Sequence, residues 1–157
     1  MSWAIVRVRG TVNVKSKISK TLKFLRLRRP NHCIIVPEND SYKGMLNIVK
    51  DYVTWGEITP ASVEMLAKDR IHLEGGNVVS TAELKSLGFK NVKDFAKQIS
   101  EGKVHLNNMR KIKPVIRLHP PIKGYEGNKR SYKEGGSLGY RGEEINNLIG
   151  RMCYASK

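Results

Sequence analysis

The stretch KSKISKTLKFLRLRR, residues 15–29, is the part of the chain that decides how the rest is interpreted. Ile18, Leu22 and Leu25 recur at positions i, i+4 and i+7, and this spacing predicts an amphipathic helix with one narrow apolar face. Pro30 disfavours a helical conformation for the residue before it, so we expect the helix to end near residues 25–27. Seven cations and no acid lie in these residues. The exposed face of the helix is therefore strongly positive.

Two interpretations fit a positive helix face: a solvated surface, or a surface that binds a polyanion. A solvated helix usually mixes the signs of its charges, because opposite charges at i and i+4 stabilise it. Here the first acid of the whole chain is Glu38, well after the helix. This absence favours the polyanion-binding interpretation.

The segments around the helix predict a small β-α-β-α-β unit. Residues 3–9, WAIVRVR, form a strand with Val6 and Val8 facing a core while Arg7 and Arg9 face outward. Residues 32–37 form a second strand, residues 42–53 a second helix, and residues 53–59 a third strand. In the second helix, Gly44 indicates close approach of the backbone to the sheet or to an RNA phosphate. We expect an α+β fold in which two helices cover one face of the sheet, and the other face is open or covered by later chain.

The chain beyond residue 59 divides into a helical appendage and a basic arm. Helical patterns of mixed charge cover residues 59–102, and residues 113–118 predict a last strand. Residues 122–141 are rich in Gly, Lys, Arg and Tyr and nearly without aliphatic side chains, so they cannot bury a core of their own. They are either a disordered loop or an arm that becomes ordered on RNA, with its cations at phosphates and its tyrosines stacked on bases. An amphipathic helix over residues 142–152 follows, so we expect the arm to be anchored at both ends.

The overall charge restricts the class of partner. The chain has 157 residues, 29 Lys and Arg against 14 Asp and Glu, and a net charge of +15, which indicates an anionic partner such as nucleic acid. An anionic membrane is the competing partner, but no stretch is long and apolar enough to span one. The first ten residues do not have the pattern of a signal peptide, so we expect a cytoplasmic protein.

No residue pattern indicates catalysis or metal binding. Cys33 and Cys153 belong to no CxxC motif, and the four histidines lack the spacing of metal ligands or of a catalytic pair. Glu143 and Glu144 are explained by their position at a helix N-terminus. The glycines of residues 135–139 lack a Walker lysine. We therefore expect no enzyme activity, no cofactor, no metal and no small-molecule substrate.

Four segments carry a resemblance to a known family: WAIVRVRG, the helix closing on LRLRR, HCIIVPEND and SYKGMLNIVKDYV. They resemble the ribosomal protein thirty family of the large subunit, whose eukaryotic members carry the number seven. The stretch KEGGSLGYRGEEINNLIGRM resembles the C-terminal part of the long, archaeal-type members. The resemblance implies an antiparallel, ferredoxin-like sheet, ribosomal RNA binding, neighbouring ribosomal proteins and a position near the five-S rRNA on the ribosome.

These observations together predict a ferredoxin-like RNA-binding core at residues 1–59, and at residues 60–157 the appendage, the arm and the last helix. The predicted function is that of a structural, rRNA-binding constituent of the large ribosomal subunit. The alternative is a free-standing RNA-binding regulator acting on messenger or transfer RNA. The residues predicted to contact RNA are Arg7, Arg9, Lys15, Lys17, Lys20, Lys23, Arg26, Arg28, Arg29, Lys43, Lys123, Tyr125, Lys129, Arg130, Tyr132, Lys133, Tyr140 and Arg141.

Overall fold

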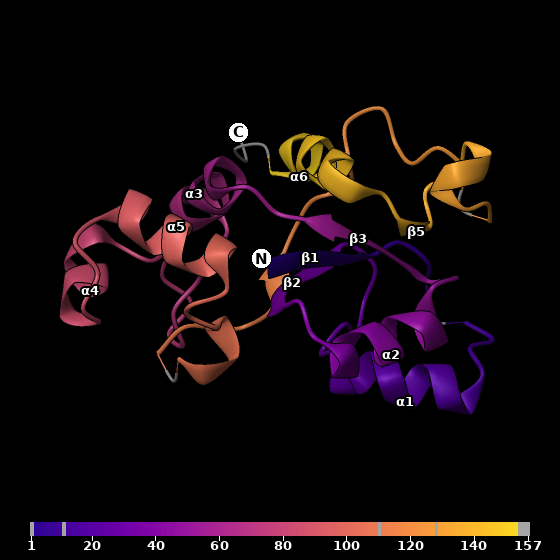
Figure 1. Ribbon diagram of the computed structural model, residues 1–157, viewed down its shortest axis with the longest axis horizontal. Helices are drawn as coiled ribbons and strands as arrows, with labels where there is room; N and C mark the ends of the chain where they lie inside the picture. The colour runs from indigo at the N-terminus through magenta and orange to yellow at the C-terminus, as the bar shows by residue number, and fades with distance from the viewer. Residues whose placement is uncertain (1, 11, 110, 128, 154–157) are drawn as a thin grey trace.

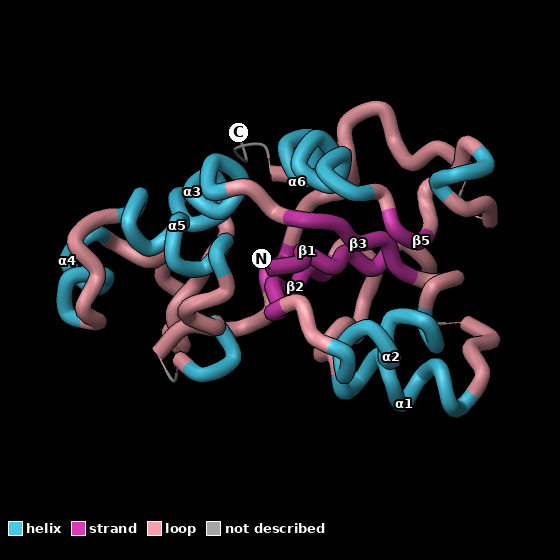
Figure 2. The backbone as a smooth tube through the Cα atoms, viewed as in Figure 1, coloured by secondary structure: helices cyan, strands magenta, loops and turns pink. Residues whose placement is uncertain are grey.

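A five-stranded sheet lies at the centre of the computed structural model, which describes residues 2–10, 12–109, 111–127 and 129–153. The strand order is β4-β2-β1-β3-β5. Figures 1 and 2 show α1 and α2 on one side of the sheet, α6 on the other, and α3, α4 and α5 in a lobe beside it. The strands are β1 (Ser2–Arg7), β2 (His32–Pro37), β3 (Val53–Glu57), β4 (Ile116–Arg117) and β5 (Gly139–Tyr140).

The predicted order of strands and helices in the first third of the chain is confirmed, and β1 is the central strand. It pairs antiparallel with β2, placing Ile5 opposite Ile34, and antiparallel with β3, placing Ile5 opposite Trp55. Every residue of β1 is buried, so the predicted alternation between core and solvent is wrong. Its physical reason is that helices cover both faces of the sheet: Ala4 and Val6 face one core, and Ile5 faces the other.

The sheet of the core, β1 to β3, is antiparallel as predicted, and the added strand β5 makes the whole sheet mixed. β5 runs parallel to β3, with Thr54 opposite Gly139 and Trp55 opposite Tyr140. This strand is contributed by the predicted arm, which returns along the edge of β3 and is held there by a 2.9 Å bond from the Arg141 amide to the Trp55 carbonyl. A two-residue strand of Gly and Tyr has no periodicity that the sequence could reveal.

Two helices cover one face of the sheet, as predicted: α1 (Ser16–Phe24) and α2 (Asp40–Val49). Leu22 and Leu25 of the predicted apolar face are buried, together with Leu46 and Val49 of α2. α1 ends at Phe24, with Leu25 as its C-cap, in agreement with the expected end of the helix.

The other face of the sheet is covered by later parts of the chain. The helix over it is α6 (Ile145–Met152), and the lobe beside the sheet consists of α3 (Pro60–Asp69), α4 (Thr81–Ser86) and α5 (Val92–Glu101). Phe95 and Ile99 of α5 and Leu148 of α6 belong to the same hydrophobic core as Ala4 and Val6 of β1. This core crosses the predicted boundary at residue 59, and the division into 1–59 and 60–157, which includes residues outside the described part, stays a prediction.

The arm has internal structure of its own. It contains the 3-10 turn η2 (Tyr132–Glu134), whereas the turns η1 (Leu106–Asn108) and η3 (Gly142–Glu144) lie before and after it. Within the arm, the Tyr132 amide donates to the Leu138 carbonyl at 2.7 Å, and the Ser137 hydroxyl donates to the Glu126 carbonyl at 2.6 Å. Leu138 is buried. These contacts fold the arm against the edge of β3.

Candidate nucleic-acid interface

The end of α1 is shaped by a Schellman motif. The Leu27 amide donates to the Leu22 carbonyl at 2.9 Å, and the Arg26 amide donates to the Lys23 carbonyl at 3.0 Å. Leu27 is fully buried, while Arg26 and Arg28 on either side of it are exposed. The motif therefore reverses the chain and fixes two arginines on the surface beside a buried leucine.

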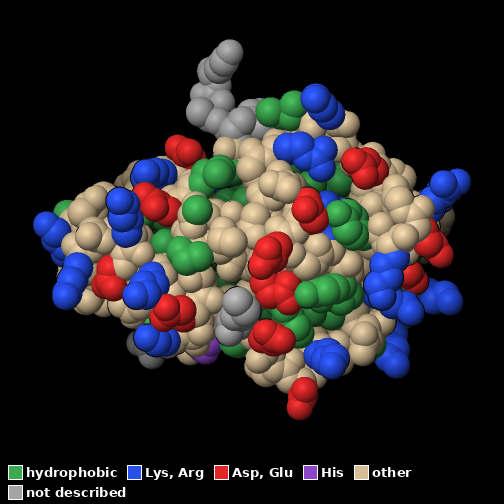
Figure 3. All heavy atoms as spheres, turned by 45° about the horizontal axis from the view of Figure 1, so that its top comes forward, with side chains coloured by type: hydrophobic (Ala, Val, Ile, Leu, Met, Phe, Trp, Pro, Cys, Tyr) green, Lys and Arg blue, Asp and Glu red, His purple; other side chains and the backbone are tan. Residues whose placement is uncertain are grey.

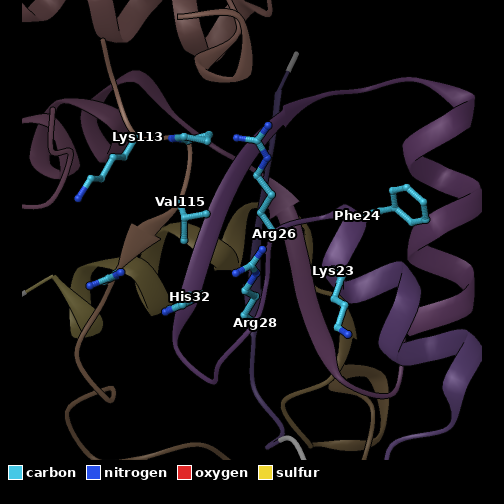
Figure 4. Close-up of a pocket in the computed structure, with 9 residues that line it drawn as sticks. Lys23, Phe24, Arg26, Arg28, His32, Lys113 and Val115 are labelled. Carbon is cyan, nitrogen blue, oxygen red and sulfur yellow. The ribbon is translucent and has the colours of Figure 1, made fainter. Parts of the chain in front are cut away.

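These arginines line a basic groove of about 680 Å³. Figure 4 shows Arg26 and Arg28 in its middle, between Lys113 and Val115 on one side and Lys23 and Phe24 on the other. None of the described residues that line the groove is acidic. The lining residues are Lys23, Phe24, Arg26, Arg28, His32, Lys113, Pro114, Val115 and Arg117. Cations that converge on one hollow, without carboxylates to neutralise them, are suited to bind phosphate groups.

His32 lies in this groove at the start of β2, opposite Arg117 of β4. Its pKa lies below the ordinary value of 6.5, first because of burial and then because of Arg117, Arg29 and Arg7. Burial disfavours any charge at this position, whereas the three arginines contribute a positive potential. That positive potential attracts anions to the open part of the groove.

Arg7, predicted to face outward, is buried, and it is one of three predicted RNA contacts whose side chains bond within the protein. Only 4% of its surface is exposed, and its guanidinium donates to the carbonyls of Leu27 (2.7 Å), Arg9 (3.0 Å) and Gly10 (3.0 Å). All three acceptors are backbone groups next to the basic turn. Arg7 thus supports the turn from inside, because it lies on the face of β1 that α1 and the turn after it cover.

Arg141 and Tyr125 are the other two. Arg141 is buried and donates to the Thr54 hydroxyl at 2.8 Å and to the Ser137 carbonyl at 2.8 Å; burial lowers its pKa. The Tyr125 hydroxyl, on a partly buried side chain, donates to the Asn31 side chain at 2.6 Å, and burial raises its pKa. Both side chains anchor the arm within the protein, and their contact with RNA stays a prediction.

The remaining tyrosines of the arm are also engaged within the protein. The Arg141 guanidinium lies 5.0 Å from the centre of the Tyr132 ring. The Tyr140 hydroxyl donates to the Glu57 carboxylate at 2.6 Å, and this hydrogen bond raises its pKa to about 12. Glu38 and Glu143 raise the Tyr140 pKa further, so Tyr140 lies in an acidic neighbourhood that disfavours phosphate.

Most of the other predicted cations are exposed but lie outside the groove. Arg9, which is partly exposed, stacks over the Tyr52 ring at 5.0 Å. The exposed ones are Lys15, Lys17, Lys20, Arg29, Lys43, Lys123, Lys129, Arg130 and Lys133. The structure brings together Lys23, Arg26 and Arg28 of the predicted set. Their contact with RNA stays a prediction.

Six groove residues were not predicted from the sequence: Phe24, His32, Lys113, Pro114, Val115 and Arg117. Lys113 and Arg117 lie more than eighty residues from α1 in the chain and reach the groove only because β4 pairs with β2. A sequence signal did exist for Phe24, which falls outside the apolar positions of the helix and is 81% exposed.

A different face, shown in Figure 3, carries acids and bases together, with carboxylates gathered near its middle. Ion pairs join Lys68 to Glu64 (3.2 Å) and Lys103 to Glu101 (3.1 Å) in the helical lobe. The cations of the groove contrast with this mixed surface.

Across the described ranges, no helix is long and apolar enough to cross a membrane, and no three His, Cys, Asp or Glu lie where they could hold a metal ion.

The α+β fold and the basic groove define the class as a nucleic-acid-binding protein of mixed architecture. The family model described as ribosomal protein L30p/L7e matches residues 3–53, which include β1, α1, β2 and α2. The large ribosomal subunit protein uL30 of Methanocella arvoryzae is 45% identical over 151 residues, which are 96% of this chain and 99% of that protein. Those of Thermoplasma volcanium and Methanococcus vannielii are 47% and 46% identical, over 95% and 97% of this chain and 91% and 99% of their own lengths. The chain belongs to the uL30 family, and the predicted resemblance is confirmed.

Proposed function

We propose that this protein is a structural constituent of the large ribosomal subunit and binds large-subunit rRNA through the basic groove at the end of α1. The observation that carries the proposal is the convergence of Lys23, Arg26, Arg28, Lys113 and Arg117 on one groove without an acid among its described lining residues. The relatives that match nearly the whole chain are large-subunit ribosomal proteins, which supports this choice of RNA.

The proposed mechanism is electrostatic and depends on the shape of the RNA. Each phosphate that a cation neutralises releases bound counterions, so the affinity falls steeply as salt rises, with a logarithmic slope of about −0.7 to −0.9 per phosphate contact. A folded rRNA brings phosphates of separate strands close together, and this arrangement matches cations that come from both α1 and β4. The exposed cations of α1 and of the arm extend the contact beyond the groove.

We extend the proposal to a role without catalysis. The protein stabilises folded rRNA during assembly and translation on cytoplasmic ribosomes, next to other ribosomal proteins and near the five-S rRNA. These finer assignments follow from the family resemblance, whereas the groove supports the RNA contact.

A test is to reverse two charges in the groove with Lys23→Glu and Arg28→Glu in one tagged variant. The matched control is Lys93→Glu with Lys97→Glu, which changes the net charge equally on the exposed face of α5. We expect the groove variant to stay in the light fractions of a sucrose gradient and the control to sediment with large subunits, while both melt like the unaltered protein. Sedimentation of the groove variant with large subunits at the normal level would contradict the proposal.

A further inference from the structure

An exposed aromatic ring stands beside the cations of the groove. Phe24 lies in the last turn of α1, and 81% of its surface is exposed, whereas its neighbours Leu22 and Leu25 are buried. A single exposed apolar residue is normal on a protein surface. Phe24 differs because it lines the same hollow as Lys23, Arg26 and Arg28.

The conformation of Arg26 gives an independent indication that this hollow is used. Arg26 has a φ of 62°, the left-handed conformation that ends a helix in a Schellman motif. Glycine is favoured at this position because it has no Cβ, and any other side chain is strained there. An arginine occupies this position although glycine would be less strained there, and its side chain lines the groove.

The wall of the groove opposite Phe24 carries both apolar and charged side chains. Pro114 and Val115 provide apolar surface, and Lys113 and Arg117 provide charge. In Figure 4 the labelled members of this wall, Lys113 and Val115, lie across from Phe24 with Arg26 between them. A volume of about 680 Å³ falls in the range of sites that hold a small molecule or one residue of a polymer.

We propose that this groove seats a single unpaired nucleotide of RNA, whose base stacks on the Phe24 ring while its phosphates lie against Lys23, Arg26 and Arg28. The bases of a double helix cannot stack on the Phe24 ring, because they are already stacked on one another. A nucleotide turned out of a bulge or loop exposes a free face of its base. The inference rests on the proposed function and deepens it: the groove selects an extruded nucleotide, not only a dense array of phosphates.

The test uses the full chain and two RNA hairpins that differ only by one bulged 2-aminopurine nucleotide. We expect the unaltered protein to bind the bulged hairpin roughly ten-fold more tightly than the paired one, as aromatic stacking on one base allows. We also expect its binding to quench the 2-aminopurine fluorescence. Phe24→Ala should remove both the preference and the quenching, and it should leave the affinity for the paired hairpin unchanged.

Two further variants make the result specific to stacking. Phe24→Trp keeps a flat ring and should keep the preference, and Val78→Ala removes an exposed apolar side chain from the lobe and should behave like the unaltered protein. Phe24→Ala should fold, because the ring is exposed and alanine is the better helix former. Equal affinity of the unaltered protein for both hairpins, or an unchanged preference in Phe24→Ala, would overturn the inference. If binding to both hairpins is equal and steeply salt-dependent, the proposed function survives; if neither binds and the protein also fails to sediment with large subunits, both fail.

Discussion

The guanidinium of Arg7 donates a 2.7 Å hydrogen bond to the carbonyl of Leu27, and this bond joins the central strand to the turn that carries the groove arginines. Leu27 lies between Arg26 and Arg28, so the position of its carbonyl fixes the direction in which both side chains leave the backbone. One buried arginine thus helps to position two exposed ones.

The first prediction concerns this buried arginine. Arg7→Lys keeps the charge but cannot reach three carbonyls in the fixed geometry of a guanidinium. We expect the free energy of unfolding to fall by about 2–3 kcal/mol, because the buried Leu27 carbonyl and two partly buried carbonyls lose their partner. Urea denaturation measures this change. Lys20→Gln, an exposed substitution on α1, should leave the midpoint within error, and an unshifted midpoint in Arg7→Lys would contradict the assigned role.

The second prediction separates stability from binding at Arg26. Arg26→Gly relieves the left-handed strain and should raise the free energy of unfolding by about 1 kcal/mol, while it weakens RNA binding because a groove cation is lost. Thermal melting and a filter-binding titration of the same preparation measure the two effects. Arg26→Gly protein that is less stable, or that binds RNA as tightly as the unaltered protein, would be inconsistent with this account.

The third prediction concerns the pH dependence of stability. The pKa of His32 is lowered in the folded protein by burial and then by Arg117, Arg29 and Arg7, so the unfolded state binds more protons below about pH 6.5. The contribution of His32 to stability is therefore complete above the unfolded-state pKa and is lost as the pH falls below it.

Unfolding curves at a series of pH values between 5 and 8 measure this effect. His32→Gln should reduce the loss of stability at low pH relative to the unaltered protein. Parallel pH profiles for the two proteins would show that another group is responsible.

The fourth prediction concerns the contact between β3 and the chain before α6. A Cβ on Gly56 would overlap the carbonyl oxygen of Gly142, so Gly56→Ala should destabilise the protein by roughly 1–3 kcal/mol through overpacking. Gly44→Ala is the matched control. Apart from the neighbouring backbone of α2, no atom in the described part of the chain lies within 4 Å of a Cβ at Gly44, and this helical position should gain up to about 1 kcal/mol. Differential scanning calorimetry distinguishes the two signs, and equal shifts would refute the packing argument.

The sequence predicted the elements whose pattern is local. The i, i+4 and i+7 spacing of Ile18, Leu22 and Leu25 was sufficient for α1, and the apolar run of residues 32–37 was sufficient for β2. The open space around a Cβ at Gly44 shows that close packing against the sheet does not explain the glycine at this position. The sequence left two explanations, approach to the sheet or to an RNA phosphate, because only the folded structure shows which groups lie nearby.

The sequence could not predict features that depend on contacts between distant segments. The burial of Arg7 depends on the turn after α1, because Arg7 shares the face of β1 with Ile5 and donates to the Leu27 carbonyl on that side. Arg117 lines the groove because β4 pairs with β2, which places Arg117 opposite His32. Arg141 is buried, and its guanidinium donates hydrogen bonds to the Thr54 hydroxyl and the Ser137 carbonyl. Local charge patterns identify cations but do not distinguish those that face solvent from those that bond to the backbone.

The central claim is that the basic groove contacts large-subunit rRNA, and the most direct test is ultraviolet crosslinking in cells with sequencing of the bound RNA and mass spectrometry of the crosslinked peptides. We predict reads concentrated at a few sites of large-subunit rRNA and crosslinks on peptides that contain Phe24–Arg28 or Lys113–Arg117. Reads scattered over messenger and transfer RNAs would contradict the claim and favour a free-standing regulator.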